Sequence, residues 1–387
     1  MLRPPPLLFA VLYVEQPVGV GFSYKKGNQN NESYYANDMS AAEENHAFLK
    51  GFYDKYPSYA KNDLYLTAES YGGHYIPTLA KFVVEQKDLP NFKGIMVGNP
   101  YTDPYENLIG AVDTFWGHQL LPQYLYEPWA AQCHTSSDDA NDDKCTNLEA
   151  SIFSAVGKVK PYALDFPVCN YDHSHSQTSE EGLEGEVSGA LMHQQLYLAK
   201  HLANIGDKTG KRPASFAANL VTALEEVTTN HYEACAGYNE VKFLNQDTVK
   251  HALHAKSDIT WAQCSETLTY SSADSELYIE PTWEWLALNA SHLRLLVYSG
   301  DDDSVCGTIG TQLWLGEYFG EHIKRNWMPW RVNGQLAGYS MVLDKGTSKL
   351  FFATVHGAGH EVPAYKPAAA LHLFKNFING TLLSMVH

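Results

Sequence analysis

LYLTAESYGGHY, residues 64–75, passes from an apolar run to a serine, Ser70, and then to two adjacent glycines. The apolar run predicts a strand, and the residues after the glycines predict a helix. A sharp turn between them exposes the serine hydroxyl at a sheet edge and a helix N-terminus, as in the nucleophile elbow G-x-S-x-G. Ala68 replaces the first glycine of that motif and is small enough for the helix to approach closely. An ordinary Ser-Gly turn is the alternative interpretation.

The sequence on both sides of this turn alternates between short apolar runs and longer helical patterns. Strands are predicted at 12–14, 64–67 and 94–97, and helices at 38–56 and 74–86. This β-α-β-α-β order is typical of a parallel sheet with crossover helices. The inner face of the first helix is predicted to carry Ala41, Asn45, Phe48, Leu49, Phe52 and Tyr56.

The pattern changes after residue 101. Residues 102–254 contain short helical segments, cysteines and polar tracts, which predict a mainly helical cap inserted into the α/β core. Core character returns in residues 255–387, with strands at 293–298 and 349–355 and a closing amphipathic helix at 367–378. We therefore expect one discontinuous domain whose core comprises 1–101 and 255–387.

The composition is that of a globular protein, with 387 residues, 44% hydrophobic and 18% charged. The 44 acidic side chains exceed the 27 basic ones and give a net charge of −17, which would repel a phosphate backbone and disfavours nucleic-acid binding. No stretch approaches the ~20 apolar residues of a transmembrane helix, so no membrane partner is expected. The run 7–14 lacks a signal-peptide cleavage site and is interpreted as a buried strand. A peptide or a small ester is the more natural substrate.

A serine hydroxyl becomes a nucleophile when a histidine takes its proton and a carboxylate orients that histidine. After a nucleophile elbow the acid and then the base follow, each on a loop after a strand. Residues 295–306, LLVYSGDDDSVC, place Asp301, Asp302 and Asp303 after an apolar strand, and residues 351–363, FFATVHGAGHEVP, place His356 and His360 after another. A helical metal pair is the alternative for two histidines four apart, but the glycines between them disfavour a helix. Neither a metal nor a cofactor is expected.

Three motifs around the serine carry a resemblance to a known family. They are ESYGGHY at 69–75, EQPVGVGFSY at 15–24, and VGNP at 97–100 followed by Asp103. All three resemble the corresponding motifs of serine carboxypeptidases. The resemblance implies an α/β-hydrolase fold in which Ser70 is the nucleophile, Asp303 the acid and His360 the base. It also makes Asp301 a turn residue that can bind its own backbone.

The same resemblance implies how the substrate is held. The backbone N–H of Tyr71 would be one donor to the oxyanion. Glu69 would bind the free α-carboxylate of the substrate, which requires the two carboxyl groups to share a proton and favours an acidic working pH. The alternative for Glu69 is an exposed glutamate at a helix start. Cys306 would lie near the pocket as a free cysteine, either reactive or an inert small hydrophobe.

The family's N-G-G-P-G-C-S-S motif, which supplies the second oxyanion donor, does not occur in this sequence. We expect that an upstream segment with the first strands of the sheet is missing and that Cys264 has lost its disulfide partner. Removing one oxyanion donor typically costs ~10²–10³ in turnover. The 387 residues alone are therefore expected to be nearly inert towards peptides.

Cysteines and sequons indicate the compartment. Two disulfides, with their connectivity open, are predicted in the cap among Cys133, Cys145, Cys169 and Cys235. N-glycosylation is predicted at the N-x-S/T asparagines Asn31, Asn289 and Asn379. Both features favour the secretory pathway, with a vacuolar, lysosomal or extracellular destination.

The function predicted from these residues and this resemblance is a serine-type carboxypeptidase. It would release single C-terminal amino acids from peptides through an acyl-enzyme at acidic pH. One alternative is a serine carboxypeptidase-like acyltransferase, which passes the acyl group to an alcohol. Another is a carboxypeptidase-like protein that keeps the three residues without a complete site. The sequence leaves the side-chain preference and the oligomeric state open.

Overall fold

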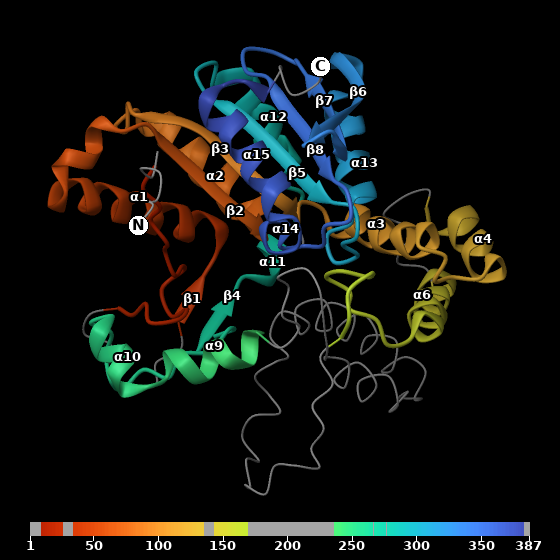
Figure 1. Ribbon diagram of the computed structural model, residues 1–387, viewed down its shortest axis with the longest axis horizontal. Helices are drawn as coiled ribbons and strands as arrows, with labels where there is room; N and C mark the ends of the chain where they lie inside the picture. Colours follow the sequence, from red (N-terminus) through yellow and green to blue (C-terminus); the bar gives the residue numbers. More distant parts are fainter. Residues whose placement is uncertain are drawn as a thin grey trace, which may run out of the picture.

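A six-stranded sheet forms the centre of the computed structural model, which describes residues 9–25, 34–134, 143–168, 236–265, 267–275 and 277–382 (Figure 1). The strand order is β2-β3-β5-β8-β7-β6. The four parallel strands are β2 (Leu64–Ser70), β3 (Phe92–Pro100), β5 (Arg294–Gly300) and β8 (Leu350–Val355). The antiparallel pair β7 (Gln335–Leu343) and β6 (Ile323–Val332) completes one edge. The predicted mostly parallel α/β sheet is confirmed.

Helices cover both faces of this sheet, so alternate residues of its central strands enter two different cores. On β5, Leu295 and Val297 belong to one core, and Leu296 and Tyr298 to the other. The first core is closed by α1 (Asp38–Lys55), α2 (Gly72–Gln86), α12 (Glu280–Asn289) and α13 (Thr308–Phe319), and the second by α14 (Val362–Tyr365) and α15 (Pro367–Asn379). Burial on both faces explains the continuous apolar runs that predicted the strands.

The inserted segment has its own apolar core at one end of the sheet. Helices α3 (Pro104–Gly117), α4 (Gln123–Gln132) and α6 (Asp143–Val156) enclose the buried side chains of Trp129 and Ile152. Figure 1 shows the three helices projecting beyond the sheet on the right of the view. A disulfide joins Cys133 to Cys145 inside this core and confirms one predicted bridge. The boundaries of the predicted cap stay a prediction.

Short elements complete the described chain. A separate two-stranded parallel sheet pairs β1 (Tyr34–Ala36) with β4 (Leu268–Tyr270). The remaining short helices are η1 (Pro57–Lys61), α9 (Ala236–Leu244), α10 (Asp247–Ala252), α11 (Ser272–Ser275) and η4 (Gly320–His322). Among the helices of the described ranges, none combines the length and apolar character that a membrane crossing requires.

Two structural predictions were wrong. Residues 12–14 form no strand, and Tyr13 is 89% exposed. A strand needs a ladder partner, and β2, the outer strand on that side, pairs only with β3 in the part of the chain that is described. Phe48 in α1 and Tyr56, the C-cap residue of this helix, are exposed although an inward orientation was predicted. His46 is buried instead, because its Nε2 lies 2.8 Å from a carboxylate oxygen of Asp88.

Candidate active site

Ser70 ends β2 and occupies the turn that leads directly into α2. Its φ of 59° lies in the left-handed region, which costs energy for any residue other than glycine and is typical of strained functional turns. Gly72 is required just after it, because a Cβ at that position would lie 2.4 Å from the Cβ of Ala68. Ala68 can occupy the first position of the elbow because Gly72, the residue of α2 that faces it, has no side chain.

Asp303 and His360 meet in the interior at the carboxyl ends of β5 and β8. His360 Nδ1 lies 2.7 Å from Asp303 Oδ2, and the side chains are 4% and 0% exposed. The two loops approach closely because Gly300 has no side chain: a Cβ there would lie 2.3 Å from the carbonyl oxygens of Ala358 and Gly359. With Nδ1–H donating to the carboxylate, Nε2 of the neutral imidazole keeps the lone pair that a base needs.

The Asp303 carboxylate receives three further donors. The backbone N–H of Val305 donates to Oδ1 at 2.8 Å, and the N–H of Cys306 donates to Oδ2 at 3.1 Å. The Asn99 side chain donates to Oδ2 at 2.8 Å, and its own oxygen accepts the N–H of Gly300 at 3.0 Å. Donors of this kind stabilise a buried ionised carboxylate. Sequence reasoning assigned no role to Asn99, which lies within β3, one residue before the strand ends.

Burial and charge shift the pKa values of both titratable neighbours of Ser70. Burial lowers the pKa of His360, but the Asp303 carboxylate, together with Glu69 and Glu361, outweighs burial and raises it to about 9. Burial raises the pKa of Glu69 from its usual 4.5 to about 7, against the opposing charge of His360. Glu69 therefore keeps its proton at acidic pH although it lies next to the candidate nucleophile. The residue itself is solvent-exposed, as the alternative interpretation expected, so water partly offsets the desolvation that raises this pKa.

The three consecutive aspartates each pair with a different histidine. Asp301 Oδ2 lies 2.7 Å from His356 Nδ1, and its Oδ1 accepts the N–H of Gly357 at 2.6 Å. The predicted local turn role of Asp301 is thus replaced by a contact to the neighbouring loop. Asp302 pairs with His118, whose Nε2 lies 3.2 Å from Oδ1. His356 does not reach Asp303.

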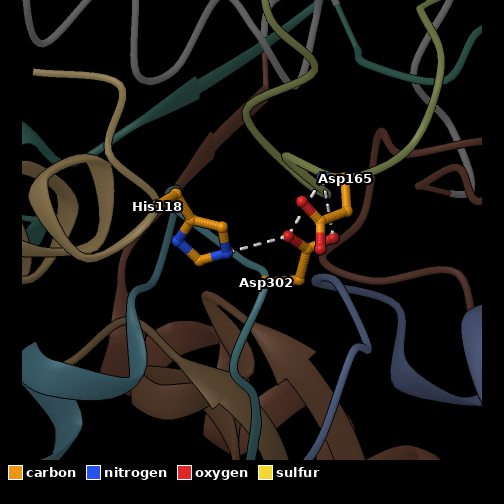
Figure 2. A group of neighbouring side chains, drawn as sticks. All are labelled: His118, Asp165 and Asp302. Carbon is orange, nitrogen blue, oxygen red and sulfur yellow. Dashed lines mark hydrogen bonds and ion pairs between the residues drawn. The ribbon is translucent and has the colours of Figure 1, made fainter.

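Asp302 also anchors the segment that follows α6. The backbone N–H of Asp165 donates to both oxygens of Asp302, at 3.0 and 3.1 Å. Figure 2 shows His118, Asp165 and Asp302 converging from three parts of the chain, with ligand atoms within 4.8 Å of one another. Such a group could hold a metal ion, but the hydrogen bond with Asp302 raises the pKa of His118 to about 8, which favours the imidazolium over a metal ligand. We interpret the group as an ion pair that ties the cap to the aspartate loop.

Ser70 lies beside the buried thiol of Cys306. Burial raises the pKa of Cys306, and a side-chain hydrogen bond with Ser70 opposes that shift. In the part of the chain that is described, no hydrogen bond joins Ser70 to His360, so that contact stays a prediction. Sequence reasoning also missed Tyr162. Its ring packs edge-on against the His360 ring, with centroids 5.0 Å apart, and its backbone carbonyl oxygen accepts the backbone N–H of His360 at 2.7 Å.

The other predicted positions are placed as follows. Tyr71 is the N-cap of α2, where helix N–H groups are free to face a ligand. Cys264 and Cys306 are unpaired, as expected. Asn289 and Asn379 are exposed at the ends of α12 and α15. Outside the described residues lie Cys169, Cys235 and Asn31.

Comparisons with known proteins agree with this architecture. A family model described as serine carboxypeptidase matches residues 8–380. Serine carboxypeptidase-like 26 of Arabidopsis thaliana is 30% identical over 381 residues, which cover 97% of this chain and 73% of that protein. Serine carboxypeptidase 24 of the same plant is 29% identical, with 96% and 72% covered.

A solved structure supports the fold. Kex1(delta)p, a prohormone-processing carboxypeptidase from Saccharomyces cerevisiae, superposes with a TM-score of 0.59 at 16% identity, covering 95% of this chain and 73% of its own. At that identity the likeness concerns the fold alone. Together with the family match over almost the whole sequence, it shows that this chain belongs to the serine carboxypeptidase family and has its α/β-hydrolase fold.

Proposed function

We propose that this protein is a serine-type carboxypeptidase that releases single C-terminal amino acids from peptides. The observation that carries the proposal is the buried Asp303–His360 pair, at 2.7 Å, which is linked towards Ser70 through Cys306, whose N–H donates to Asp303 and whose thiol forms a hydrogen bond with the Ser70 side chain. The elbow supplies a nucleophile, the pair supplies a base of fixed tautomer, and the glutamate selects a substrate with a free carboxylate.

The reaction follows from these positions. Ser70 Oγ attacks the carbonyl carbon of the last peptide bond, and His360 Nε2 takes the hydroxyl proton. The Tyr71 N–H donates to the developing oxyanion. His360 then gives its proton to the leaving amine, so the C-terminal amino acid departs and an ester to Ser70 remains. Water, deprotonated by the same imidazole, hydrolyses that ester and restores the serine.

Glu69 accounts for the requirement for a free C-terminus. Two carboxylates repel each other, whereas a carboxylic acid donates a hydrogen bond to a carboxylate. Because the pKa of Glu69 is raised to about 7, it is protonated on the acidic side of neutrality and can bind the substrate there. Above that pH the bound pair must take up a proton, and the Michaelis constant is expected to rise.

His360 favours a higher pH than Glu69 does, because a general base must be unprotonated. Its pKa of about 9 describes the free site, in which the Glu69 carboxylate is one of the causes that raise it. In the complex the pair of Glu69 and the substrate carboxylate still carries one negative charge, whereas exclusion of water by the substrate lowers the pKa of the imidazole. The acid limb of kcat is therefore expected at lower pH than the acid limb of kcat/KM, which reports the free enzyme.

Secretory localisation belongs to the same proposal. The Cys133–Cys145 disulfide is typical of an oxidising compartment, and the sequon asparagines Asn289 and Asn379 are exposed as glycosylation requires. A vacuolar, lysosomal or extracellular destination fits the proposed acidic working pH.

The test is release of the C-terminal residue from a blocked dipeptide at about pH 5, with the C-terminal amide of the same dipeptide as matched control. The 387-residue chain is expected to hydrolyse the acid slowly and the amide far more slowly, with all release lost in Ser70→Ala. Covalent labelling of Ser70 by a phosphonofluoridate, located by mass spectrometry, gives a second readout that needs no peptide.

The outcomes separate the competing functions. Ester formation from an added alcohol in place of hydrolysis would identify an acyltransferase. Absence of both Ser70 labelling and Ser70-dependent release would identify a non-catalytic member of the family. Equal hydrolysis of the acid and the amide would contradict the role of Glu69.

A further inference from the structure

A second buried Asp–His contact lies behind the nucleophile turn, away from Asp303 and His360. Asp38, the first residue of α1, is 8% exposed, and its Oδ2 lies 2.8 Å from Nδ1 of the fully buried His74. Its Oδ1 accepts the hydroxyl of Tyr71 at 3.2 Å and the hydroxyl of Tyr270 at 2.6 Å. We call Asp38, Tyr71, His74 and Tyr270 the Asp38 network. It joins α1, α2 and β4.

The donors of this network are fixed by their surroundings. Burial, with Asp38 and neighbouring hydroxyls, raises the pKa values of Tyr71 and Tyr270, so both phenols keep the proton that they donate. His74 donates through Nδ1–H, because its Nε2 is buried without a hydrogen-bond partner among the described residues. Asp38 thus accepts three hydrogen bonds, and a neutral side chain could not accept all three with the same charge assistance.

The aromatic rings make the arrangement rigid. Tyr71 stacks on His74 with ring centroids 4.6 Å apart and an interplanar angle of 14°. The ring of Tyr270 meets Tyr71 edge-on at 5.4 Å. Interior side chains packed in this way have few alternative positions. The side chain of Tyr71 is therefore held at its ring and at its hydroxyl.

The position of Tyr71 connects the Asp38 network to the proposed oxyanion site. Tyr71 directly follows Ser70, and its backbone N–H is the proposed oxyanion donor. It is also the N-cap of α2, and no side chain caps this helix. The turn is strained at Ser70, and it lacks the side-chain cap that usually holds the first turn of a helix. The backbone N–H of Tyr101 donates to the Ser70 carbonyl oxygen at 2.8 Å, and the side-chain anchor of the turn is the tether from the Tyr71 hydroxyl to Asp38, 33 residues earlier in the chain.

We propose that Asp38 is a positioning residue that aligns the Tyr71 N–H with the oxyanion through the Tyr71 and His74 side chains. This rests on the proposed function of Ser70 and Tyr71 in acyl transfer. An oxyanion donor binds more strongly in the transition state than in the substrate complex. Loss of the alignment lowers kcat and leaves the Michaelis constant almost unchanged.

The test compares Asp38→Asn with a matched control, Asp274→Asn. Asp274 accepts the backbone N–H of Asp38 at 2.7 Å but binds neither the Tyr71 hydroxyl nor His74. It therefore reports a general loss of stability in the same region. Asp38→Asn is expected to lower kcat by about tenfold to a hundredfold, less than complete removal of a donor, with the Michaelis constant within about twofold. Asp274→Asn is expected to keep kcat within about twofold.

Amide hydrogen exchange gives a readout that does not need an active enzyme. In Asp38→Asn the peptide covering 70–76 should exchange at least about tenfold faster, while the β8 peptide 350–355 keeps the wild-type rate. Asp274→Asn should leave both peptides unchanged. Absence of Ser70-dependent release in the wild type would contradict the proposed function alone, since the exchange data still test the network.

Three outcomes would overturn the inference. Unchanged kcat in Asp38→Asn would show that the tether does not align the donor. An equal loss of kcat in both variants would show only general destabilisation. Unchanged exchange at 70–76 would show that the turn holds itself. A selective fall in kcat together with faster exchange at 70–76 supports the inference.

Discussion

Two Asp–His pairs stand side by side at the carboxyl ends of β5 and β8, with the same separation and different surroundings. Asp303 Oδ2 to His360 Nδ1 and Asp301 Oδ2 to His356 Nδ1 both measure 2.7 Å. The histidine and aspartate side chains are 4% and 0% exposed in the first pair, and 64% and 35% exposed in the second. The Asp–His distance therefore does not distinguish the candidate catalytic pair from the surface ion pair. The exposed fraction of the side chains does.

The hydrogen bonds around the two carboxylates explain how the burial is sustained. A buried ion pair is stable only when further donors replace the lost water. Asp303 receives them from Asn99 and from the N–H groups of Val305 and Cys306, whereas Asp301 receives one from Gly357 and is otherwise solvated. The inner pair thus has a fixed geometry in a low dielectric, and the outer pair is screened.

The largest effect is expected from Asp303→Asn. The amide cannot accept Nδ1–H and keep its other contacts, so the imidazole adopts the opposite tautomer and loses the lone pair on Nε2. Kcat should fall by about 10³–10⁴-fold at an unchanged fold, as measured with the blocked dipeptide and by circular dichroism. A loss below about tenfold would show that burial of this pair has no catalytic consequence.

Asn99→Ala removes one supporting donor from the inner pair and is expected to have the next largest effect. Asp303 Oδ2 then keeps only His360 and the Cys306 N–H, and the buried Gly300 N–H loses its acceptor, which costs about 1–3 kcal/mol of stability and about tenfold or more in kcat. Asn107→Ala is the matched control, because Asn107 donates to the Val305 carbonyl oxygen at 2.8 Å and does not contact Asp303. Equal loss of kcat in both variants would mean that the loop, not the carboxylate, is what Asn99 supports.

Glu69→Gln tests whether the raised pKa of Glu69, beside the inner pair, sets the pH response. In the wild type the Michaelis constant should rise by up to about tenfold per pH unit above about 7, the raised pKa of Glu69, because the ionised form repels the substrate carboxylate. Glutamine does not titrate, so the variant's Michaelis constant should stay flat between pH 6 and about 8.5. A parallel rise in both enzymes would assign the effect to another group.

The raised pKa of Glu69 also makes the stability of the fold depend on pH. The folded pKa of Glu69 lies above its usual value of 4.5, so its contribution to stability is complete below about 4.5 and is lost as pH rises to about 7. Glu69→Gln should therefore lose less stability than the wild type between these pH values, as thermal unfolding can measure. An identical pH dependence of Tm in the two proteins would contradict the raised pKa of this carboxyl group.

The elbow, the parallel strands and the α/β class could be predicted because each is encoded locally, by apolar runs and by the glycines after Ser70. The choice of Asp303 over Asp301 came from family resemblance, since both follow the same strand and differ only in tertiary burial. Asn99 and Asp38 have no local signal: their partners lie 204 residues away for the Asn99–Asp303 bond and 232 for the Asp38–Tyr270 bond. The strand predicted at 12–14 failed because pairing depends on a neighbour.

Asp301→Asn is expected to have the smallest effect and is the sharpest control for the comparison. It changes the same atoms as Asp303→Asn, two residues away, in a pair of the same length. An exposed ion pair contributes about 1 kcal/mol or less, because water solvates both charges and salt screens them. Asparagine can still accept the Gly357 N–H through its oxygen, so the loop should keep its position. We expect kcat within about twofold of the wild type and a small decrease in Tm that shrinks further in 0.5 M salt, whereas the loss in Asp303→Asn should not depend on salt. A tenfold fall in kcat would show instead that the outer pair orients His360 through the shared loop 356–360. Burial would then not be enough to distinguish the catalytic pair from a surface ion pair.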